Sequence, residues 1–290
     1  MHLIVGASGA VGVPTIKHLV AKGERVRALT SSDQSAARLK SLGVTETIVG
    51  DFRRNEDVAR AVAGMKSVLH IPPRFTEDEG AISRRVIDAA RAARVEHFCF
   101  CSAYHSPMRA LGHHWQKLET EEYLIDSDLL YTVVQPSMFM QNIRVEWAKV
   151  AGEGIYARPY SPDSLMSVID TDNLGEAFAN ILTQRRLQGA TYELNGPGPI
   201  THNQMAAIIS EELGRPVKAV KRDLSEWEGW ARARGWADYS IKTYVAMCKH
   251  YNDHGYKYGN EVQLTAILGR APNDYRTFIR RFVAEQAKAN

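Results

Sequence analysis

The chain of 290 residues has few cysteines, no long apolar run and no large excess of charge of either sign. Three cysteines are too few for a disulfide framework, and we expect Cys99 and Cys101, two apart in one strand, to be small core residues. A catalytic thiol is the alternative for this pair. No stretch approaches the roughly 18 apolar residues of a membrane span, and the first residues do not form a signal peptide. These absences predict a cytoplasmic protein that does not enter a membrane.

The charges give no sign of a nucleic-acid partner. The formal net charge is +3, and the basic doublets at 53–54 and 280–281 are isolated. Hydrophobic residues make up 44% of the chain and charged residues 24%, enough for a large core. Composition therefore favours a soluble enzyme acting on a small-molecule substrate, and we expect no metal site.

The first twelve residues carry the most specific signal, because an apolar run ends in three glycines spaced three apart. Gly6 would allow a tight turn off a strand, Gly9 a close approach of backbone N–H groups to a pyrophosphate, and Gly12 close packing of helix and strand. The spacing is G-x-x-G-x-x-G, a different subtype from the common G-x-G-x-x-G. A glycine-rich turn without a ligand is the alternative. The predicted cofactor contacts in this turn are Gly6, Ser8, Gly9, Ala10, Val11 and Gly12.

Short β-rich runs alternate with helical patterns over the first 135 residues. The expected strands are 2–5, 25–29, 46–49, 67–71, 97–102 and 130–135, and the expected helices are 13–22, 35–42, 56–63, 79–94 and 114–125. Alternation of this kind predicts an α/β fold with a doubly wound parallel sheet of the Rossmann type, covered by helices on both faces.

The regular alternation loosens after residue 135. Strands are expected at 166–169 and 191–194, followed by a turn at 195–198 and a helix capped by Thr201 that runs to Leu213. Further helices are expected at 223–234, 238–250 and 273–287. We predict a dinucleotide-binding domain over 1–150. Residues 151–290 are expected to return strands to the sheet and to form a smaller, mainly helical substrate lobe.

The end of the second strand bears on the choice of cofactor. An NAD site usually places a carboxylate there, whereas an NADP site leaves room for a 2′-phosphate. Neither an acid nor an arginine stands at this tip, and Arg38 or Lys40 of the next helix would be within reach of a phosphate. We therefore expect NADP(H) to be favoured over NAD(H), although Asp33 would hold a ribose if the register shifted by one residue. The hydroxyl groups expected to bind the phosphate are Thr30, Ser31 and Ser32.

The next two strands end in further candidates for cofactor contact. Asp51 and Phe52 are expected beside the adenine, and a helix cap is the alternative role for Asp51. Ile71 and Pro72 begin a rigid loop that we expect to cross the cofactor. Phe75 in this loop is a candidate lid over the ligand.

The chemistry is expected after the fifth and sixth strands. Ser102 ends the fifth strand, and His113 and Lys117 share one face of the next helix, as do Lys117 and Glu121. Lys117 would bind the nicotinamide ribose and, as a cation, lower the pKa of a neighbouring donor; an exposed lysine paired with Glu121 is the alternative. His113, beside a helix N-terminus and an ammonium group, is expected to be neutral near pH 7. His114 is expected on the outer side.

Together these motifs resemble the NmrA-like group of atypical short-chain dehydrogenases/reductases, relatives of isoflavone-reductase-like enzymes and of NADPH-dependent quinone and azo reductases. The resemblance implies that Lys117 takes the lysine slot of those reductases and that the residues Pro136, Met138 and Phe139 line the nicotinamide. Two departures stand out: His113 replaces the usual tyrosine proton donor, and Ser31 replaces the usual arginine after the second strand. The resemblance covers nearly the whole chain and includes the glycine turn and residues 26–29, 50–52, 113–124, 131–142, 191–197, 251–255 and 268–272.

The family contains both NADPH-dependent reductases and proteins that bind the dinucleotide without turnover to report redox state, and the fold alone does not choose between them. We expect an enzyme, with a non-catalytic redox sensor as the alternative. A lyase or isomerase that retains the cofactor has no feature of its own in the sequence. A homodimer is compatible with the sequence. The aromatic residues Trp227, Trp230, Trp236 and Tyr239 indicate a pocket for a flat apolar substrate, or else simply a core.

Overall fold

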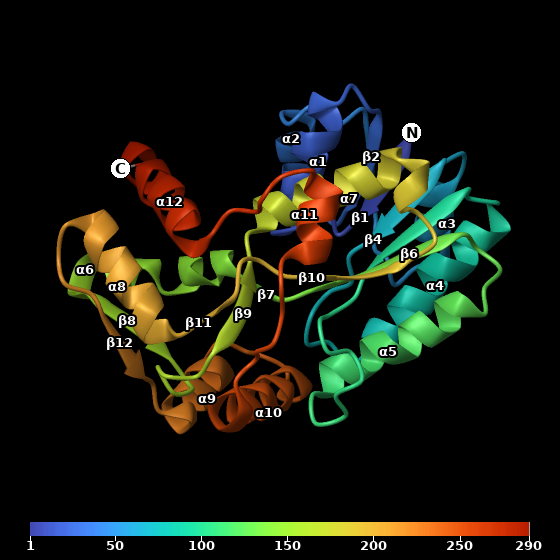
Figure 1. Cartoon of the computed structure of the whole chain (residues 1–290). Coiled ribbons are helices and arrows are strands. Elements are labelled where there is room, and N and C mark those ends of the chain that lie inside the picture. Colours follow the sequence, from blue (N-terminus) through green and yellow to red (C-terminus); the bar gives the residue numbers. More distant parts are fainter. Residues whose placement is uncertain (290) are drawn as a thin grey trace.

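The computed structural model describes residues 1–289 and is built around a seven-stranded parallel sheet (Figure 1). Its strands are β1 (His2–Val5), β2 (Val26–Thr30), β3 (Glu46–Val49), β4 (Ser67–His70), β5 (His97–Cys101), β6 (Tyr131–Pro136) and β10 (Thr191–Leu194). Their order is β10-β6-β5-β4-β1-β2-β3, so the direction of winding reverses between β1 and β4. Ligands of such sheets bind off the carboxyl ends of the strands at this reversal. The predicted fold class is confirmed.

Helices cover both faces of the sheet (Figure 1). On one face lie α3 (Asn55–Val62), α4 (Glu79–Ala92) and α5 (Gly112–Ile125), and on the other lie α1 (Gly12–Ala21), α2 (Asp33–Lys40), α7 (Thr171–Thr183) and α11 (Val262–Leu268). The central strands β1, β4 and β5 are buried on both sides, which is why they are short apolar runs without alternation. Helix α2 begins two residues before the predicted start at 35, because Ser32 accepts a hydrogen bond from Ser35 N as its N-cap.

The chain after β6 forms two small additional sheets and a second core. One sheet contains β7 (Met138–Phe139), β9 (Met166–Ile169) and β11 (Pro199–Ile200), and the other pairs β8 (Ile155–Arg158) with β12 (Lys218–Lys221). The accompanying helices are α6 (Trp147–Glu153), α8 (His202–Leu213), α9 (Leu224–Ala233), α10 (Asp238–His254) and α12 (Tyr275–Ala289), with 3₁₀ turns at Met140–Val145 and Arg185–Leu187. Helix α8 starts at the predicted cap, where Thr201 Oγ1 accepts from Gln204 N at 3.1 Å.

The two halves of the chain share a core. Side chains of α7, β10 and α11 pack with those of α1 and β1 in one apolar cluster, so part of the second half completes the dinucleotide-binding fold. A second cluster joins α8, α10 and α12 with β8 and β9. The domain division at residue 150 stays a prediction. No helix within residues 1–289 combines the length and the apolar character needed to cross a membrane.

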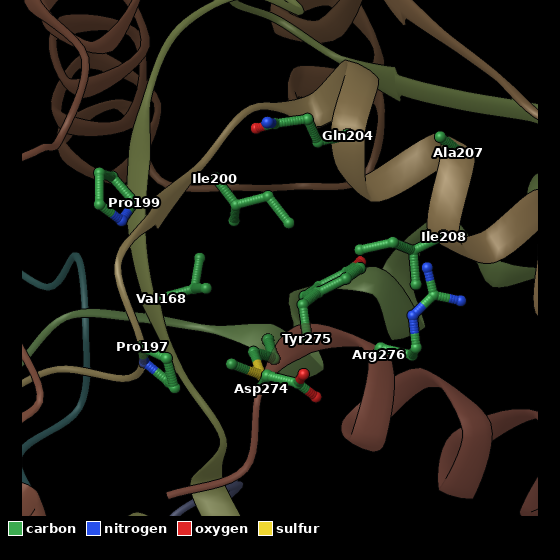
Figure 2. A pocket seen from close by; sticks show the side chains of 11 residues that line it. Val168, Pro197, Pro199, Ile200, Gln204, Ala207, Ile208, Asp274, Tyr275 and Arg276 are labelled. Atoms are coloured by element: carbon green, nitrogen blue, oxygen red, sulfur yellow. The ribbon is translucent and has the colours of Figure 1, made fainter.

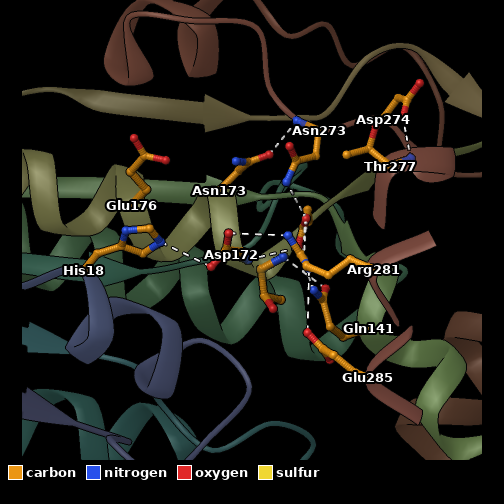
Figure 3. Close-up of polar contacts among 12 residues, drawn as sticks. His18, Gln141, Asp172, Asn173, Glu176, Asn273, Asp274, Thr277, Arg281 and Glu285 are labelled. Atoms are coloured by element: carbon orange, nitrogen blue, oxygen red, sulfur yellow. Dashed lines mark hydrogen bonds and ion pairs between the residues drawn. The ribbon is translucent and has the colours of Figure 1, made fainter. Parts of the chain in front are cut away.

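A buried carboxylate fixes the C-terminal helix to the corner between β9 and α7. Asp170 accepts hydrogen bonds from Arg281 at 2.8 Å, Gln141 at 2.6 Å and Asn273 at 2.8 Å. Figure 3 labels these three donors. Asp170 is 1% exposed, so its charge needs these partners. The network thereby ties together α7, α12 and the segment that directly follows the predicted nicotinamide contacts Met138 and Phe139.

Candidate cofactor and active site

The turn after β1 contains two glycines that the fold itself requires and one that it does not. Gly6 has φ +86°, and a Cβ there would lie 2.4 Å from Ile71 O; a Cβ at Gly12 would lie 2.5 Å from the carbonyl oxygens of Gly6 and Ala7. A Cβ at Gly9 would meet only Gly6 O, at 3.3 Å, and Gly9 is exposed. Gly9 is therefore free to face an incoming ligand.

Backbone donors are available in the same turn. Among the described residues, the amides of Ala10 and Val11 donate to no carbonyl or side chain, and they stand at the N-terminus of α1. Unpaired N–H groups and the helix dipole together favour an anion at this place. The turn thus fits the pyrophosphate of a dinucleotide.

The end of β2 lies beside this turn. Thr30 is buried, and its Oγ1 has no hydrogen-bond partner among the described residues. Arg38 of α2 donates from Nη2 to Ser8 O at 2.8 Å, which brings a guanidinium next to the glycine turn. The structure thus places a cation beside the glycine turn, and the predicted phosphate ligands Thr30, Ser31 and Ser32 follow the neighbouring strand β2. Their contact with a cofactor stays a prediction.

The two acids considered for cofactor contact have other partners or positions. Asp51 Oδ1 accepts from Arg53 N at 2.9 Å in the turn that precedes α3, whose N-cap is Arg54. The alternative that Asp51 caps the helix itself is therefore wrong. Asp33 is the first residue of α2, where a negative charge suits the helix dipole. A contact of Asp51 and Phe52 with adenine stays a prediction.

The loop after β4 approaches the helix that carries His113. Phe75 has φ +58°, a left-handed conformation that is strained for a bulky residue and occurs mainly at functional sites. Its ring centroid lies 4.8 Å from that of His113 and 6.0 Å from that of Tyr244 in α10. Ser240 Oγ donates to Phe75 O at 2.6 Å and attaches the loop to α10. The predicted lid residue therefore bridges α5 and α10.

Lys117 is buried and paired with an acid that the sequence did not indicate. Its Nζ lies 2.6 Å from Oε1 of Glu79, the first residue of α4, and Lys117 is only 8% exposed. The alternative of an exposed lysine paired with Glu121 is wrong, because Glu121 instead accepts hydrogen bonds from Ser102 Oγ and Gln135 Nε2. Packing of α4 against α5 produces this arrangement.

Glu79 and His70 complete the surroundings of Lys117. Burial raises the pKa of Glu79, and Lys117 opposes this shift. Burial, and to a lesser extent the charge of Lys117, lowers the pKa of His70 to about 3, so this imidazole at the end of β4 is neutral. Sequence reasoning missed both residues, because an acid in the first turn of a helix and a histidine in a strand have common structural explanations.

His113 is a neutral, buried imidazole with a free nitrogen. It is 7% exposed, and its Nδ1 has no partner among the described residues. Burial, with added effects of His114 and Lys117, lowers the pKa of His113 to about 2. The predicted direction is confirmed, although burial rather than the helix N-terminus is the main cause.

The expectation that His114 lies on the outer side is wrong. His114 is 3% exposed, its Nδ1 lies 3.2 Å from His105 O, and burial lowers the pKa of His114 to about 4. The ring of Tyr256 contacts both His114 and His105, which lies in the segment between β5 and α5, so Tyr256 covers this side of α5. The position of His114 on its helix, read from the sequence, could not reveal its contact with Tyr256.

The exits of β5 and β6 meet at this edge of the sheet. Tyr104 N donates to Pro136 O at 3.1 Å, and β7, with Met138 and Phe139, follows directly. The hydroxyl of Ser102 is bound to the buried Glu121, so a catalytic role of Ser102 stays a prediction. The predicted nicotinamide contacts thus lie at the same edge as the helix that carries His113 and Lys117.

Two of the cavities in the described chain are not lined by His113 or Lys117. One, of about 450 Å³, lies between β9, β11, α8 and the start of α12 and is lined by Val168, Ile200 and Tyr275 among others (Figure 2). The other, of about 390 Å³, lies between His105 of the β5–α5 segment and His250 of α10. No group of three or more metal-ligating side chains occurs within residues 1–289.

None of the predicted aromatic pocket residues lines either cavity. Trp227 is buried and stacks on Tyr244 with ring centroids 4.0 Å apart. Trp230 and Trp236 pack beside Trp227 but are 39% and 38% exposed. This cluster therefore packs α9 against α10, and a substrate contact through it stays a prediction.

A model of the NmrA-like family matches residues 2–259. An NAD(P)H azoreductase of Xenophilus azovorans is 28% identical over 233 residues, which cover 78% of this chain and 78% of that protein. An NADPH-dependent quinone oxidoreductase from Escherichia coli, solved with NADPH, has a TM-score of 0.83 at 20% identity, over 98% of this chain and 100% of that one. NmrA, a negative transcriptional regulator solved with NAD, has a TM-score of 0.79 at 18% identity, over 100% and 98%.

At these identities, the likeness to the two solved structures establishes the fold alone. The family match covers most of the sequence, from β1 to the segment after α10. The chain belongs to the NmrA-like family.

Proposed function

We propose that this protein is an NADP(H)-dependent oxidoreductase that reduces a small conjugated substrate of the quinone, azo, enone or carbonyl type. The observation that carries the proposal is the pair His113 and Lys117, buried one turn apart on α5 at the carboxyl edge of the sheet. A neutral imidazole with a free nitrogen is a suitable hydrogen-bond partner for a substrate oxygen or nitrogen.

The cofactor half of the proposal rests on the glycine turn. The free amides of Ala10 and Val11 and the open position at Gly9 fit a pyrophosphate. Arg38 and the unpartnered Thr30 hydroxyl fit a 2′-phosphate, and this favours NADP(H). Names of relatives agree with this chemistry, since the azoreductase is called NAD(P)H-dependent and the quinone oxidoreductase NADPH-dependent.

The residues of this chain would position the cofactor and the substrate and would polarise the acceptor atom. Bound NADPH supplies the hydride. Lys117 would orient the nicotinamide ribose, with Glu79 fixing its ammonium group. His113 would donate an N–H hydrogen bond to the acceptor atom, while Phe75 covers this side of the site. Conjugated acceptors delocalise the developing charge, so they need no strong protein acid, and this reconciles the absent tyrosine with catalysis.

A redox sensor that binds the dinucleotide without turnover is the second candidate. Two observations favour it: Glu79 neutralises Lys117, and neither described cavity is lined by His113 or Lys117. The similar fold of the regulator NmrA is compatible with it.

The deciding experiment is NADPH oxidation by the full chain with a panel of quinones, azo dyes, aldehydes and enones. We expect turnover with at least one conjugated acceptor and a large loss of rate in a Lys117 variant. Tight NADP(H) binding without turnover of any acceptor would refute the reductase and leave the sensor.

A further inference from the structure

Arg158 at the end of β8 is a buried cation without a counter-ion. It is 9% exposed, and within residues 1–289 no carboxylate lies in ion-pair distance of its guanidinium. Nη2 donates to Asn142 O at 2.7 Å, but Nε is buried without a partner. Burying an uncompensated charge costs several kcal/mol, so such a group normally has an anionic partner.

The side chains around Arg158 do not supply that charge. Its guanidinium lies 5.3 Å from the ring centroid of Tyr156, and burial keeps the neighbouring Tyr160 hydroxyl protonated by raising its pKa. Glu146, which is also buried, is already paired with Arg222 at 2.7 Å. His202, which contacts the Tyr160 hydroxyl through Nε2 at 3.4 Å, has a buried Nδ1 without a partner.

A second arginine without an acid partner, Arg74, lies in the loop after β4, with its guanidinium 5.9 Å from the ring centroid of Phe75. The Arg74 side chain reaches solvent, and within the described residues it makes no ion pair. Burial nevertheless lowers the pKa of Arg74; Tyr244 opposes this shift, and the positive charge of Arg158 adds to it. Phe75 contacts Tyr244, which packs in one cluster with Tyr156 and Tyr160, and Arg158 lies against Tyr156. Two cations without acid partners therefore adjoin the same aromatic cluster, which is a suitable environment for an anion.

Both arginines adjoin the proposed reaction site. The Tyr160 hydroxyl lies 3.7 Å from the sulfur of Met138, one of the predicted nicotinamide contacts. Arg74 precedes Phe75, whose ring contacts both His113 and Tyr244. A substrate held against His113 would therefore extend toward Arg74 and Arg158.

We infer that Arg74 and Arg158 bind an anionic group of the substrate, a carboxylate, sulfonate or phosphate carried on its conjugated body. This inference rests on the proposed function for the placement of the reacting end, and it adds the substrate class: an organic acid rather than a neutral quinone or enone. Planar guanidinium groups bind these oxyanions through paired hydrogen bonds.

The test is calorimetric titration of the full chain, saturated with NADP⁺, with 2-naphthalenesulfonate and with its neutral analogue methyl 2-naphthyl sulfone. We expect the sulfonate to bind at least about tenfold more tightly. Arg74→Met should remove about tenfold of sulfonate affinity and leave sulfone affinity unchanged. Arg84→Met, at an exposed arginine on α4, is the matched control and should change neither.

Arg158→Met tests the buried member of the pair, and Arg158→Lys, which keeps the charge, should retain more sulfonate affinity. If Arg158→Met does not fold, the exposed Arg74 variant still decides. Equal affinity for sulfonate and sulfone, equal loss of both in Arg74→Met, or no sulfonate binding at millimolar concentration would overturn the inference. Because the titration measures binding and not turnover, its result is independent of whether NADPH is oxidised.

Discussion

The three glycines of the turn after β1 are required for different physical reasons. Gly6 and Gly12 are required by backbone atoms that a Cβ would strike, whereas a Cβ at Gly9 would meet only Gly6 O, at 3.3 Å. The sequence spacing predicted a tight turn at Gly6, ligand approach at Gly9 and close packing at Gly12. The backbone contacts agree with the first and the third, and the approach of a ligand to Gly9 stays a prediction.

The difference leads to a prediction for Gly9→Ala. The variant should keep its free energy of unfolding within about 1 kcal/mol and lose at least about tenfold in NADP(H) affinity, since the new Cβ stands where the pyrophosphate approaches. Chemical denaturation and cofactor titration measure the two quantities. Gly229→Ala, in open space on α9, is the control. Unchanged NADP(H) affinity in folded Gly9→Ala would show that the cofactor does not approach this turn.

Lys117 cannot be removed alone without a second effect. Lys117→Met leaves the carboxylate of Glu79 buried and unpaired, and we expect a loss of roughly 3–5 kcal/mol in the free energy of unfolding. The double variant Lys117→Met with Glu79→Gln should recover most of that stability and none of the turnover. Urea denaturation and NADPH oxidation separate the two outcomes. Full turnover in the stable double variant would remove Lys117 from the mechanism.

At the level of elements, the sequence predicted those parts that local patterns determine. The limits of β1, β3, β9 and β10 match the prediction, and the cap at Thr201 places the start of α8. The strands β8 and β12 were missed, because they pair over more than fifty residues of intervening chain and β12 is largely exposed, without alternation. Glu79 was missed as a partner of Lys117 for a related reason: the contact joins α4 to α5, and no local spacing encodes it.

Helix α2 provides a prediction about cofactor choice. Arg38→Ala should weaken NADP(H) binding about tenfold and leave NAD(H) binding nearly unchanged, because only the 2′-phosphate would contact the guanidinium. Lys66→Ala, at an exposed lysine that directly precedes β4 at the opposite end of the strands, is the control. Titration with both cofactors measures the effect. An equal loss for NADP(H) and NAD(H) would show that Arg38 only holds the glycine turn through Ser8.

The molecule as a whole buries an unusual set of titratable groups. Burial is the main cause that lowers the pKa of five histidines: to about 3 for His70, about 4 for His97, about 2 for His113, about 4 for His114 and about 3 for His202. They lie in both halves of the chain, in the parallel sheet, at the start of α5 and in α8. A fall in pH therefore destabilises the sheet, the candidate site and the C-terminal lobe together.

The sign of the pH effect follows from these shifts. Between the folded pKa values and 6.5 the unfolded chain binds protons that the folded chain does not, so stability is present above about pH 6.5 and is lost as the pH falls. Each fully buried histidine costs on the order of 1–2 kcal/mol at pH 5. The losses of the buried histidines have the same sign, so we expect the free energy of unfolding to fall between pH 6.5 and pH 5.

Urea denaturation between pH 7.5 and pH 5 measures how the free energy of unfolding depends on pH. A variant without one of the buried histidines tests the contribution of that residue. His97, whose Nε2 lies 2.8 Å from Thr132 Oγ1 inside the sheet, is replaced by glutamine, which keeps a hydrogen-bonding group but does not titrate. His97→Gln should reduce the pH dependence below pH 6 by up to about 1.4 kcal/mol per pH unit, whereas His254→Gln, at an exposed position, should leave it unchanged. A free energy of unfolding that stays level from pH 7 to pH 5 in the parent chain would mean that water reaches these imidazoles, and the buried, neutral state assigned to His113 would fall with it.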